Sequence, residues 1–187
     1  MQFGLLNMNL YNFPIHKKSP YFVNALIEIP RGSSAKYEYH PDGYFFYDRS
    51  LMSAMSYPAN YGFIPSTLAD DGDALDVLVY NSTPIDRGTI VECKVIGVLD
   101  MDDECSNVGH HKDYKILATP TSHVRNYESL NCIDPMFLSI SKNFFAHYKE
   151  LNNKKTKIYD WHEKEKAFQI IDESIKLKQN SKDRRYE

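Results

Sequence analysis

The 187-residue chain has few cysteines, and their spacing is uninformative for any known cross-link. Cys93, Cys105 and Cys132 are an odd number, and the sequence contains no CxxC pair. This usage argues against a disulfide framework and against a structural zinc site, because both need paired or regularly spaced cysteines. We therefore expect reduced thiols, as in a cytoplasmic protein.

The chain also lacks an excess of charge of one sign and any long apolar run. Its 22 basic and 25 acidic residues give a formal net charge of −3, which offers no general electrostatic reason to bind nucleic acid or an anionic membrane. No stretch approaches the ~20 apolar residues of a membrane span. Residues 1–18 have no leading basic segment and no small-residue cleavage site, so we expect no signal peptide and a cytoplasmic location.

What the chain does contain is enough apolar sequence for one core, since 42% of its residues are hydrophobic. We expect a single domain over residues 1–187. Within it, residues 1–19 would form an N-terminal extension, and the polar residues 179–187 would form a frayed tail. No internal repeat or linker divides the chain.

The hydrophobic pattern predicts strands first and helices afterwards. Strand-like runs occur at 21–30, 35–40, 43–49, 74–80, 88–101 and 114–120. Gly97 is expected to form a bulge or bend in the long fifth run. Beyond residue 133 the pattern predicts a helix over 134–152 with Asp134 as N-cap, a short strand over 154–161, and a helix over 162–178. This order favours an α+β fold built on a small closed barrel.

An acidic stretch stands just ahead of one predicted strand. Residues 70–79 read DDGDALDVLV, and Asp71, Asp73 and Asp76 lie close together around the flexible Gly72. Three like charges at this spacing need solvent or cations, so the stretch predicts a site for Mg²⁺ or Mn²⁺. The alternative is a solvated acidic turn. An EF-hand loop is excluded because the twelfth position is Ser82 rather than glutamate.

Further charged groups are spread along the chain. Acidic residues cluster at 100–104, and Asp113 precedes the strand over 114–120. The hairpin over 35–49 carries basic and acidic groups that form either an exposed salt-bridge ladder or one wall of an anion site. Separate acidic clusters and scattered basic groups suit a small, multiply anionic substrate, most simply a phosphate compound. The basic candidates are Lys36, Arg49, Lys115, Lys149 and Lys155.

Taken together, these motifs resemble those of the soluble family I inorganic pyrophosphatases of the short, bacterial type. The resemblance extends from about residue 19 to residue 178. It runs through IEIP (27–30), KYE (36–38), DR (48–49), YPANYGF (57–63), DGDALDVLV (71–79), DDE (102–104), DYK (113–115) and FFAHYKEL (144–151). The fold class it implies is α+β, mainly β: a small closed five-stranded OB-like β-barrel flanked by two C-terminal helices.

The resemblance also implies a mechanism and a site. Pyrophosphate would be hydrolysed to two phosphates by in-line attack of a metal-bridging water, with several Mg²⁺ ions as cofactors and Mn²⁺ as a substitute. Asp73 would be the general base, and the metal ligands would be Asp71, Asp76, Asp103 and Asp113. Phosphate would be held by Lys36, Arg49, Tyr61, Tyr148 and Lys149. A supporting charged shell would contain Glu28, Glu38, Glu104, Lys115 and Lys155. The family further implies a homo-oligomer, a hexamer.

One segment departs from the family pattern. Residues 105–112, CSNVGHHK, are several residues longer than the family predicts, so the register of Asp103 against Asp113 is the weakest part of the match. His110 and His111 in this segment belong either to a solvated loop or to a metal site. Two other functions stay open: a different metal-dependent phosphohydrolase such as a nucleotide pyrophosphatase, and a nucleic-acid-binding module, which the acidic rim at 70–76 disfavours.

Overall fold

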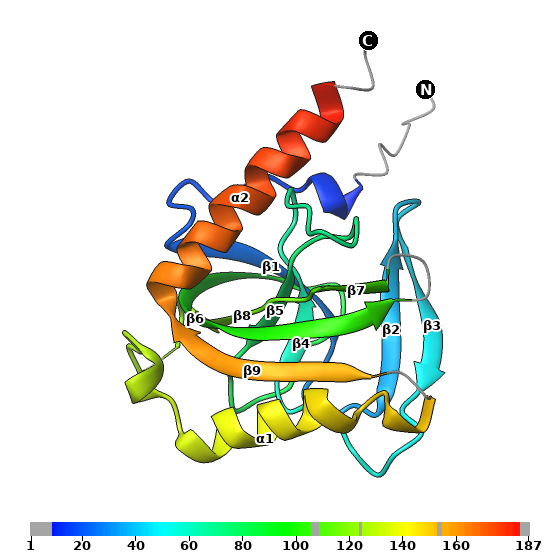
Figure 1. Cartoon of the computed structure of the whole chain (residues 1–187). Coiled ribbons are helices and arrows are strands. Elements are labelled where there is room, and N and C mark those ends of the chain that lie inside the picture. The colour runs from blue at the N-terminus through cyan, green and yellow to red at the C-terminus, as the bar shows by residue number, and fades with distance from the viewer. Residues whose placement is uncertain (1–8, 106–108, 124, 153–154, 184–187) are drawn as a thin grey trace.

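Five strands close into a ring at the centre of the computed structural model, which describes residues 9–105, 109–123, 125–152 and 155–183 (Figure 1). Around the ring each strand pairs with the next, and the last pairs with the first. All pairings are antiparallel except the parallel one between the third and fourth strands. In ring order the strands are β1 (Phe22–Ile29), β4 (Asn60–Phe63), β5 (Asp76–Val79), β8 (Lys115–Pro120) and β6 (Ile90–Cys105). The predicted five-stranded, OB-like α+β fold is confirmed.

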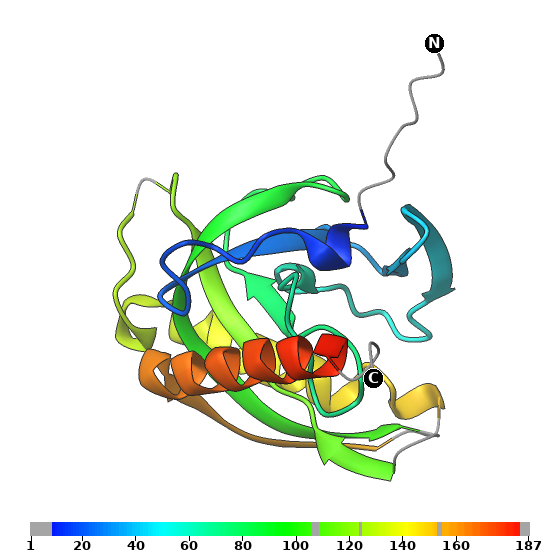
Figure 2. The ribbon, with the colours of Figure 1, turned by 90° about the horizontal axis from the view of Figure 1, so that it is seen from above.

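The remaining elements surround this ring. Strands β7 (Gly109–Lys112) and β9 (Thr156–Glu163) pair with β6 outside the ring, and β2 (Ala35–His40) pairs with β3 (Tyr44–Ser50) in a separate hairpin. The helices are α1 (Pro135–His147) and α2 (Lys164–Asp183), and short 3-10 turns are η1 (Leu10–Asn12), η2 (Leu130–Cys132) and η3 (Glu150–Asn152). Helix α1 lies beneath β9 and α2 lies across the top of the strands (Figures 1 and 2).

Both faces of the ring strands are covered, which explains their nearly continuous apolar sequence. In β5, Val77 and Val79 pack in one buried cluster with Ile171 of α2. The side chain between them, Leu78, points the other way and packs in a second cluster with Phe144 of α1. The two C-terminal helices therefore bury opposite faces of the strands that carry the central charged residues.

Two glycines allow backbones to approach more closely than any side chain would permit. At Gly62 on β4, an added Cβ would lie 1.8 Å from the carbonyl oxygen of Leu26. At Gly97 on β6, it would lie 2.6 Å from the carbonyl oxygen of His162 on β9. The pairing of β6 with β8 also shifts register between Val95 and Gly97, so the predicted bulge is confirmed.

Several boundaries differ from those that the sequence pattern predicts. Strand β6 continues to Cys105, so the second acidic cluster lies within the strand, where pairing with β7 and β9 extends it. Asp134 does cap α1, since its Oδ1 accepts a hydrogen bond from the Met136 N–H at 2.9 Å. That helix ends at His147 rather than at residue 152. Helix α2 starts at Lys164, because residues up to 163 pair with β6, and continues to Asp183.

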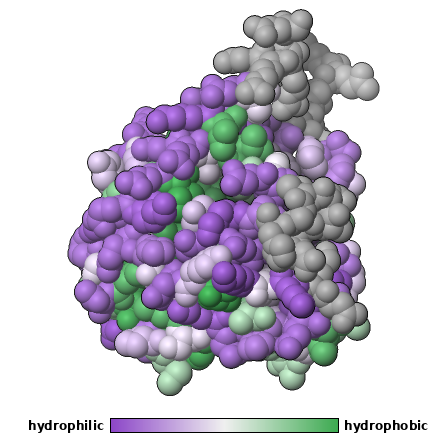
Figure 3. Space-filling view, in the orientation of Figure 1, coloured by the Kyte–Doolittle hydropathy of each residue, from purple (hydrophilic) through white to green (hydrophobic). Residues whose placement is uncertain are grey.

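The face drawn in Figure 3 is mainly hydrophilic where its residues are described, and the hydrophobic ones form small, separate patches. Within the described ranges, no helix has both the length and the apolar character that crossing a bilayer would require.

Candidate active site

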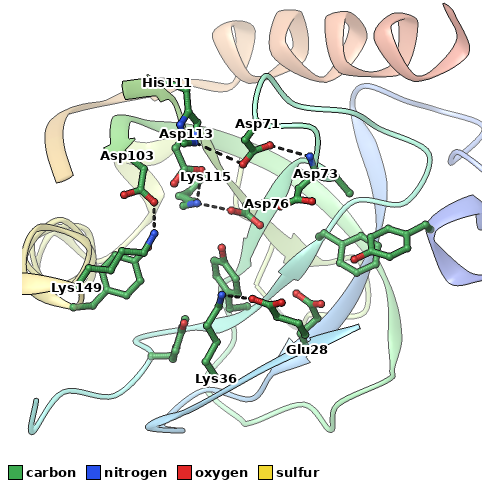
Figure 4. A pocket seen from close by; sticks show the side chains of 17 residues that line it. Glu28, Lys36, Asp71, Asp73, Asp76, Asp103, His111, Asp113, Lys115 and Lys149 are labelled. Atoms are coloured by element: carbon green, nitrogen blue, oxygen red, sulfur yellow. Dashed lines mark hydrogen bonds and ion pairs between the residues drawn. The ribbon is translucent and has the colours of Figure 1, made fainter. Parts of the chain in front are cut away.

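A pocket of about 270 Å³ collects charged side chains from most strands of the molecule (Figure 4). Seven carboxylates and three lysines are among the described residues that line it, so negative charge is in excess. Strands β1, β2, β4, β5, β6, β7 and β8 all contribute. The charged and tyrosine side chains around it are Tyr11, Glu28, Lys36, Glu38, Tyr57, Tyr61, Asp71, Asp73, Asp76, Asp103, His111, Asp113, Lys115, Tyr148 and Lys149.

Asp71 and Asp73 reach the pocket from a tight turn ahead of β5. Gly72 adopts a φ of +93°, a conformation that favours glycine, and its N–H bonds to the carbonyl of Ala69 at 3.1 Å. The Asp73 N–H donates to Asp71 Oδ1 at 3.0 Å. Both carboxylates therefore face the same space. Asp73 is solvent-accessible, yet partial desolvation and the nearby Asp71 and Asp76 raise its pKa.

Lys115 is the buried cation at the centre of the acidic group. The parallel pairing of β5 with β8 sets Asp76 beside Lys115, and the ammonium donates to Asp76 Oδ2. The same Nζ lies 2.5 Å from Asp113 Oδ1. Burial by itself lowers the pKa of Lys115, but Asp113 and Asp76 more than offset this effect and raise it. Lys115 therefore stays charged and holds two carboxylates of the pocket together.

A second ion pair joins β6 to the end of α1. The Nζ of Lys149 donates to Asp103 Oδ2, and Asp103 is only 5% exposed. Burial lowers the pKa of Lys149, although the Asp103 carboxylate opposes this effect. Burial also holds the pKa values of Tyr61 and Tyr148 well above the usual range, with nearby aspartates adding to it. Both phenols stay neutral and can donate hydrogen bonds to an anion.

The opposite wall is formed by β1 and the β2–β3 hairpin. Glu28 is 8% exposed and accepts a hydrogen bond from the Tyr39 N–H at 2.7 Å. Burial raises its pKa from 4.5 to about 8, even though this hydrogen bond lowers it. Lys36 reaches Glu38 at 2.5 Å and Asp48 at 3.3 Å. The hairpin thus carries an ion-pair ladder and also forms one wall of the pocket, while its role in holding an anion stays a prediction.

Most residues suggested by the sequence meet in this pocket, and a few do not. Arg49 pairs with Lys36 in the strand register and forms an ion pair with Asp48, but it is not among the described residues lining the pocket. Lys155 is exposed and is likewise outside the described lining. The side chains of Glu104 and His110 lie outside the described residues. Every other suggested residue lines the pocket.

Three polar lining residues, Tyr11, Tyr57 and His111, were not assigned to the site from the sequence, and neither were the apolar Phe63 and Ala74. Tyr57 belongs to YPANYGF, and its position next to Tyr61 was an available signal. His111 lies in the segment that departs from the family pattern, where a solvated loop was one of two readings. Tyr11 lies outside the family motifs, and its ring stacks on Phe63 at 4.6 Å between centroids. No motif in residues 1–19 indicated that this segment reaches the pocket.

The pocket has the donor chemistry of a site for hard divalent cations, because carboxylate oxygens predominate. Among the residues that the structure describes, no three His, Cys, Asp or Glu side chains already meet at one point. Asp76 and Asp113 turn toward Lys115, and Asp103 turns toward Lys149. Side-chain rotation away from the ammonium groups would bring these oxygens to a cation. The lining residues therefore fit divalent cations. Because negative charge is in excess, cations must also bind before a multiply anionic ligand can enter the pocket.

An OB-like barrel whose pocket combines hard oxygen donors with lysines and neutral tyrosines is typical of a metal-assisted hydrolase of phosphate compounds. Comparisons with known proteins narrow this class. The family model described as inorganic pyrophosphatase matches residues 25–179. An inorganic pyrophosphatase of Campylobacter jejuni is 44% identical over 163 residues, which cover 84% of this chain and 92% of the relative. One from Aquifex pyrophilus is 40% identical over 174 residues, covering 90% and 96%.

Solved structures agree with the sequence comparison. The inorganic pyrophosphatase of Thermus thermophilus superposes with a TM-score of 0.85 at 36% identity, covering 91% of this chain and 99% of the other. That of Helicobacter pylori gives 0.82 at 33%, covering 89% and 98%. The chain belongs to the inorganic pyrophosphatase family, which is generally metal-dependent. It is a hydrolase that converts inorganic pyrophosphate to two phosphates.

Proposed function

We propose that pyrophosphate is hydrolysed in the pocket of Figure 4 and that Mg²⁺ is the activating cation, with Mn²⁺ as a substitute. The ligands are Asp71, Asp76, Asp103 and Asp113. One observation carries the proposal: these four carboxylates come from two loops and two strands, yet line a single pocket. When bound there, the cations would neutralise the charge of the substrate and make the attacking water more acidic.

Asp73 acts as the general base. It is accessible from the pocket, and its backbone N–H is tied to Asp71, so the carboxylate is held beside a proposed metal ligand. The role requires only that Asp73 accept a proton from the attacking water while that water approaches phosphorus in line with the bond that breaks. The Asp73 side chain is exposed to solvent, which leaves its carboxylate oxygens accessible to water.

The leaving phosphate is held by donors on the other walls of the pocket. Lys36, Lys149, Tyr61 and Tyr148 present ammonium and neutral phenol groups, which stabilise negative charge as it develops. Arg49 joins them from the rim, since Asp48 links it to Lys36. Supporting charges are Glu28, Glu38, Glu104, Lys115 and Lys155, of which Lys115 has the clearest task because it pairs with two of the proposed metal ligands.

Phosphate release from pyrophosphate tests these roles. We expect turnover with Mg²⁺, none with chelator, and a loss of roughly 10²–10⁴-fold in kcat for Asp73→Asn. Asp70→Asn is the matched control, because it removes the same charge three residues earlier in the same loop, at a position that does not line this pocket. Substantial turnover by the Asp73 variant, or an equal loss in the Asp70 variant, would remove Asp73 as the base.

We extend the proposal to the context of the enzyme. Residues 1–187 form one domain with 1–19 as an N-terminal extension, and the expected frayed tail over 179–187 is corrected for residues 179–183, which belong to α2. The enzyme acts in the cytoplasm as a homo-oligomer, a hexamer. Reduced-type cysteine usage supports the location. Exposed apolar side chains on α1, Met136 at 64% and Ile140 at 49%, offer a surface for subunit contact. Sedimentation of the purified protein tests the assembly, and a monomer at micromolar concentration would refute it.

A further inference from the structure

His111 is brought into the pocket by the strand pairing of the segment that departs from the family pattern. Strand β7 pairs with β6 so that His111 lies directly opposite Asp103. Residues directly opposite each other in an antiparallel pair present their side chains on the same face. Asp103 lines the pocket, and His111 lines it too, with only 7% of its side chain exposed.

The neighbouring pair confirms this register. Lys112 lies opposite Asp102, and the Lys112 Nζ is 3.0 Å from Asp102 Oδ1 and 2.9 Å from Asp100 Oδ1. These contacts are on the other face of the hairpin, since side chains alternate along a strand. The hairpin therefore directs His111 into the pocket and Lys112 away from it.

Within the pocket, the imidazole faces a carboxylate that is proposed to ligate metal. His111 Nε2 lies 3.7 Å from Asp71 Oδ2, and Figure 4 shows the two side chains pointing toward one another beside Asp113. Two ligands of one cation in adjacent coordination positions stand about 3 Å apart, given metal–ligand distances of about 2.1 Å. The Asp73 N–H bonds to Asp71 Oδ1, whereas Oδ2 is the oxygen that faces His111. A small side-chain rotation would therefore close the remaining gap.

We propose that His111 and Asp71 together ligate a divalent first-row transition-metal cation in the pocket, for which Mn²⁺ serves as the spectroscopic probe. The inference rests on the proposed metal-ligand role of Asp71. Mg²⁺ prefers oxygen donors, whereas imidazole nitrogen suits first-row transition metals. A nitrogen ligand beside the carboxylates therefore shifts the selectivity of this position from Mg²⁺ toward transition metals. A site whose ligands were all carboxylate oxygens would not gain this preference for transition metals.

Electron spin-echo spectroscopy of Mn²⁺ bound at less than one equivalent tests the inference without turnover. We expect a ¹⁴N hyperfine coupling to Mn²⁺ in the unmodified protein and its loss in His111→Ala and His111→Gln. His162→Ala is the matched control: His162 Nε2 also lies 3.7 Å from an aspartate, Asp100, but neither lines the pocket. That variant should keep the coupling. Circular dichroism of each variant verifies folding.

Competition binding supplies the second readout. In His111→Ala the affinity for Mn²⁺ should fall by about tenfold or more, while that for Mg²⁺ changes less than about twofold, so less Mg²⁺ displaces Mn²⁺. Tight Mn²⁺ binding without ¹⁴N coupling, or coupling that survives in His111→Ala, would overturn the role of His111 and leave the proposed function standing. If the unmodified protein bound neither Mn²⁺ nor Mg²⁺, both the role of His111 and the metal assignment of the proposed function would be overturned.

Discussion

Replacing Glu28 with glutamine should stabilise the protein near neutral pH. Burial raises the pKa of Glu28 from 4.5 to about 8, so the folded state holds a proton that the unfolded state has released between these two values. Below pH 4.5 Glu28 is protonated in both states and burying it costs no ionisation free energy. As the pH rises from 4.5 toward 8, the free energy of unfolding falls, because only the unfolded state releases the proton. Glutamine has no charge to bury, and its amide oxygen can still accept the Tyr39 N–H.

The size of the effect follows from the pH interval. At pH 7, about 2.5 pH units above the unfolded pKa, each unit is worth about 1.4 kcal/mol, so the variant should gain roughly 3 kcal/mol. At pH 5 the gain should fall below about 1 kcal/mol. Urea unfolding of both proteins at the two pH values measures it, with chelator present because a bound cation would change the charge balance of the pocket.

Glu38→Gln is a control on the same wall of the pocket, because that side chain is 41% exposed. Its effect on stability should be small at both pH values, since water already solvates the carboxylate. A Glu28→Gln variant that is no more stable at pH 7, or a difference between variant and parent that does not change with pH, would contradict the assignment of a neutral buried Glu28.

Three other substitutions test the architecture of the site. Lys115→Met should cost about 3–5 kcal/mol in urea unfolding, since it leaves buried carboxylates unpaired, and a loss below about 1 kcal/mol would refute the central ion pair. Gly62→Ala should lower the melting temperature sharply, because its Cβ would overlap the Leu26 carbonyl, so a parent-like melt would show that β1 and β4 can separate there. Tyr11→Phe should cost about 1 kcal/mol by removing its hydrogen bond to a β2 carbonyl, and chemical denaturation that finds no loss would place the N-terminal segment outside the folded unit.

Local sequence determined much of this protein because its signals act over a few residues. Asp134 caps α1 through its own side chain, and Gly97 marks the bulge that the β6–β8 pairing requires. The DGDALDVLV stretch combines a glycine turn with carboxylates ahead of a buried strand, and that short-range pattern was sufficient to locate the acidic loop. Alternating apolar residues similarly predicted most strands, and apolar residues at helical spacing predicted both helices.

Only the tertiary structure decided which distant charges meet. Lys115 lies between Asp76 and Asp113 because β5 pairs in parallel with β8, and no local pattern specifies that partner. His111 enters the pocket because of its register against β6, where a shift of one residue would have turned it to the other face. Tyr11 reaches the pocket because its ring stacks on Phe63 of β4 and its hydroxyl donates to the Tyr39 carbonyl of β2. These features depend on strand register and ring closure, which join positions far apart in the sequence and therefore leave no signal in any short segment.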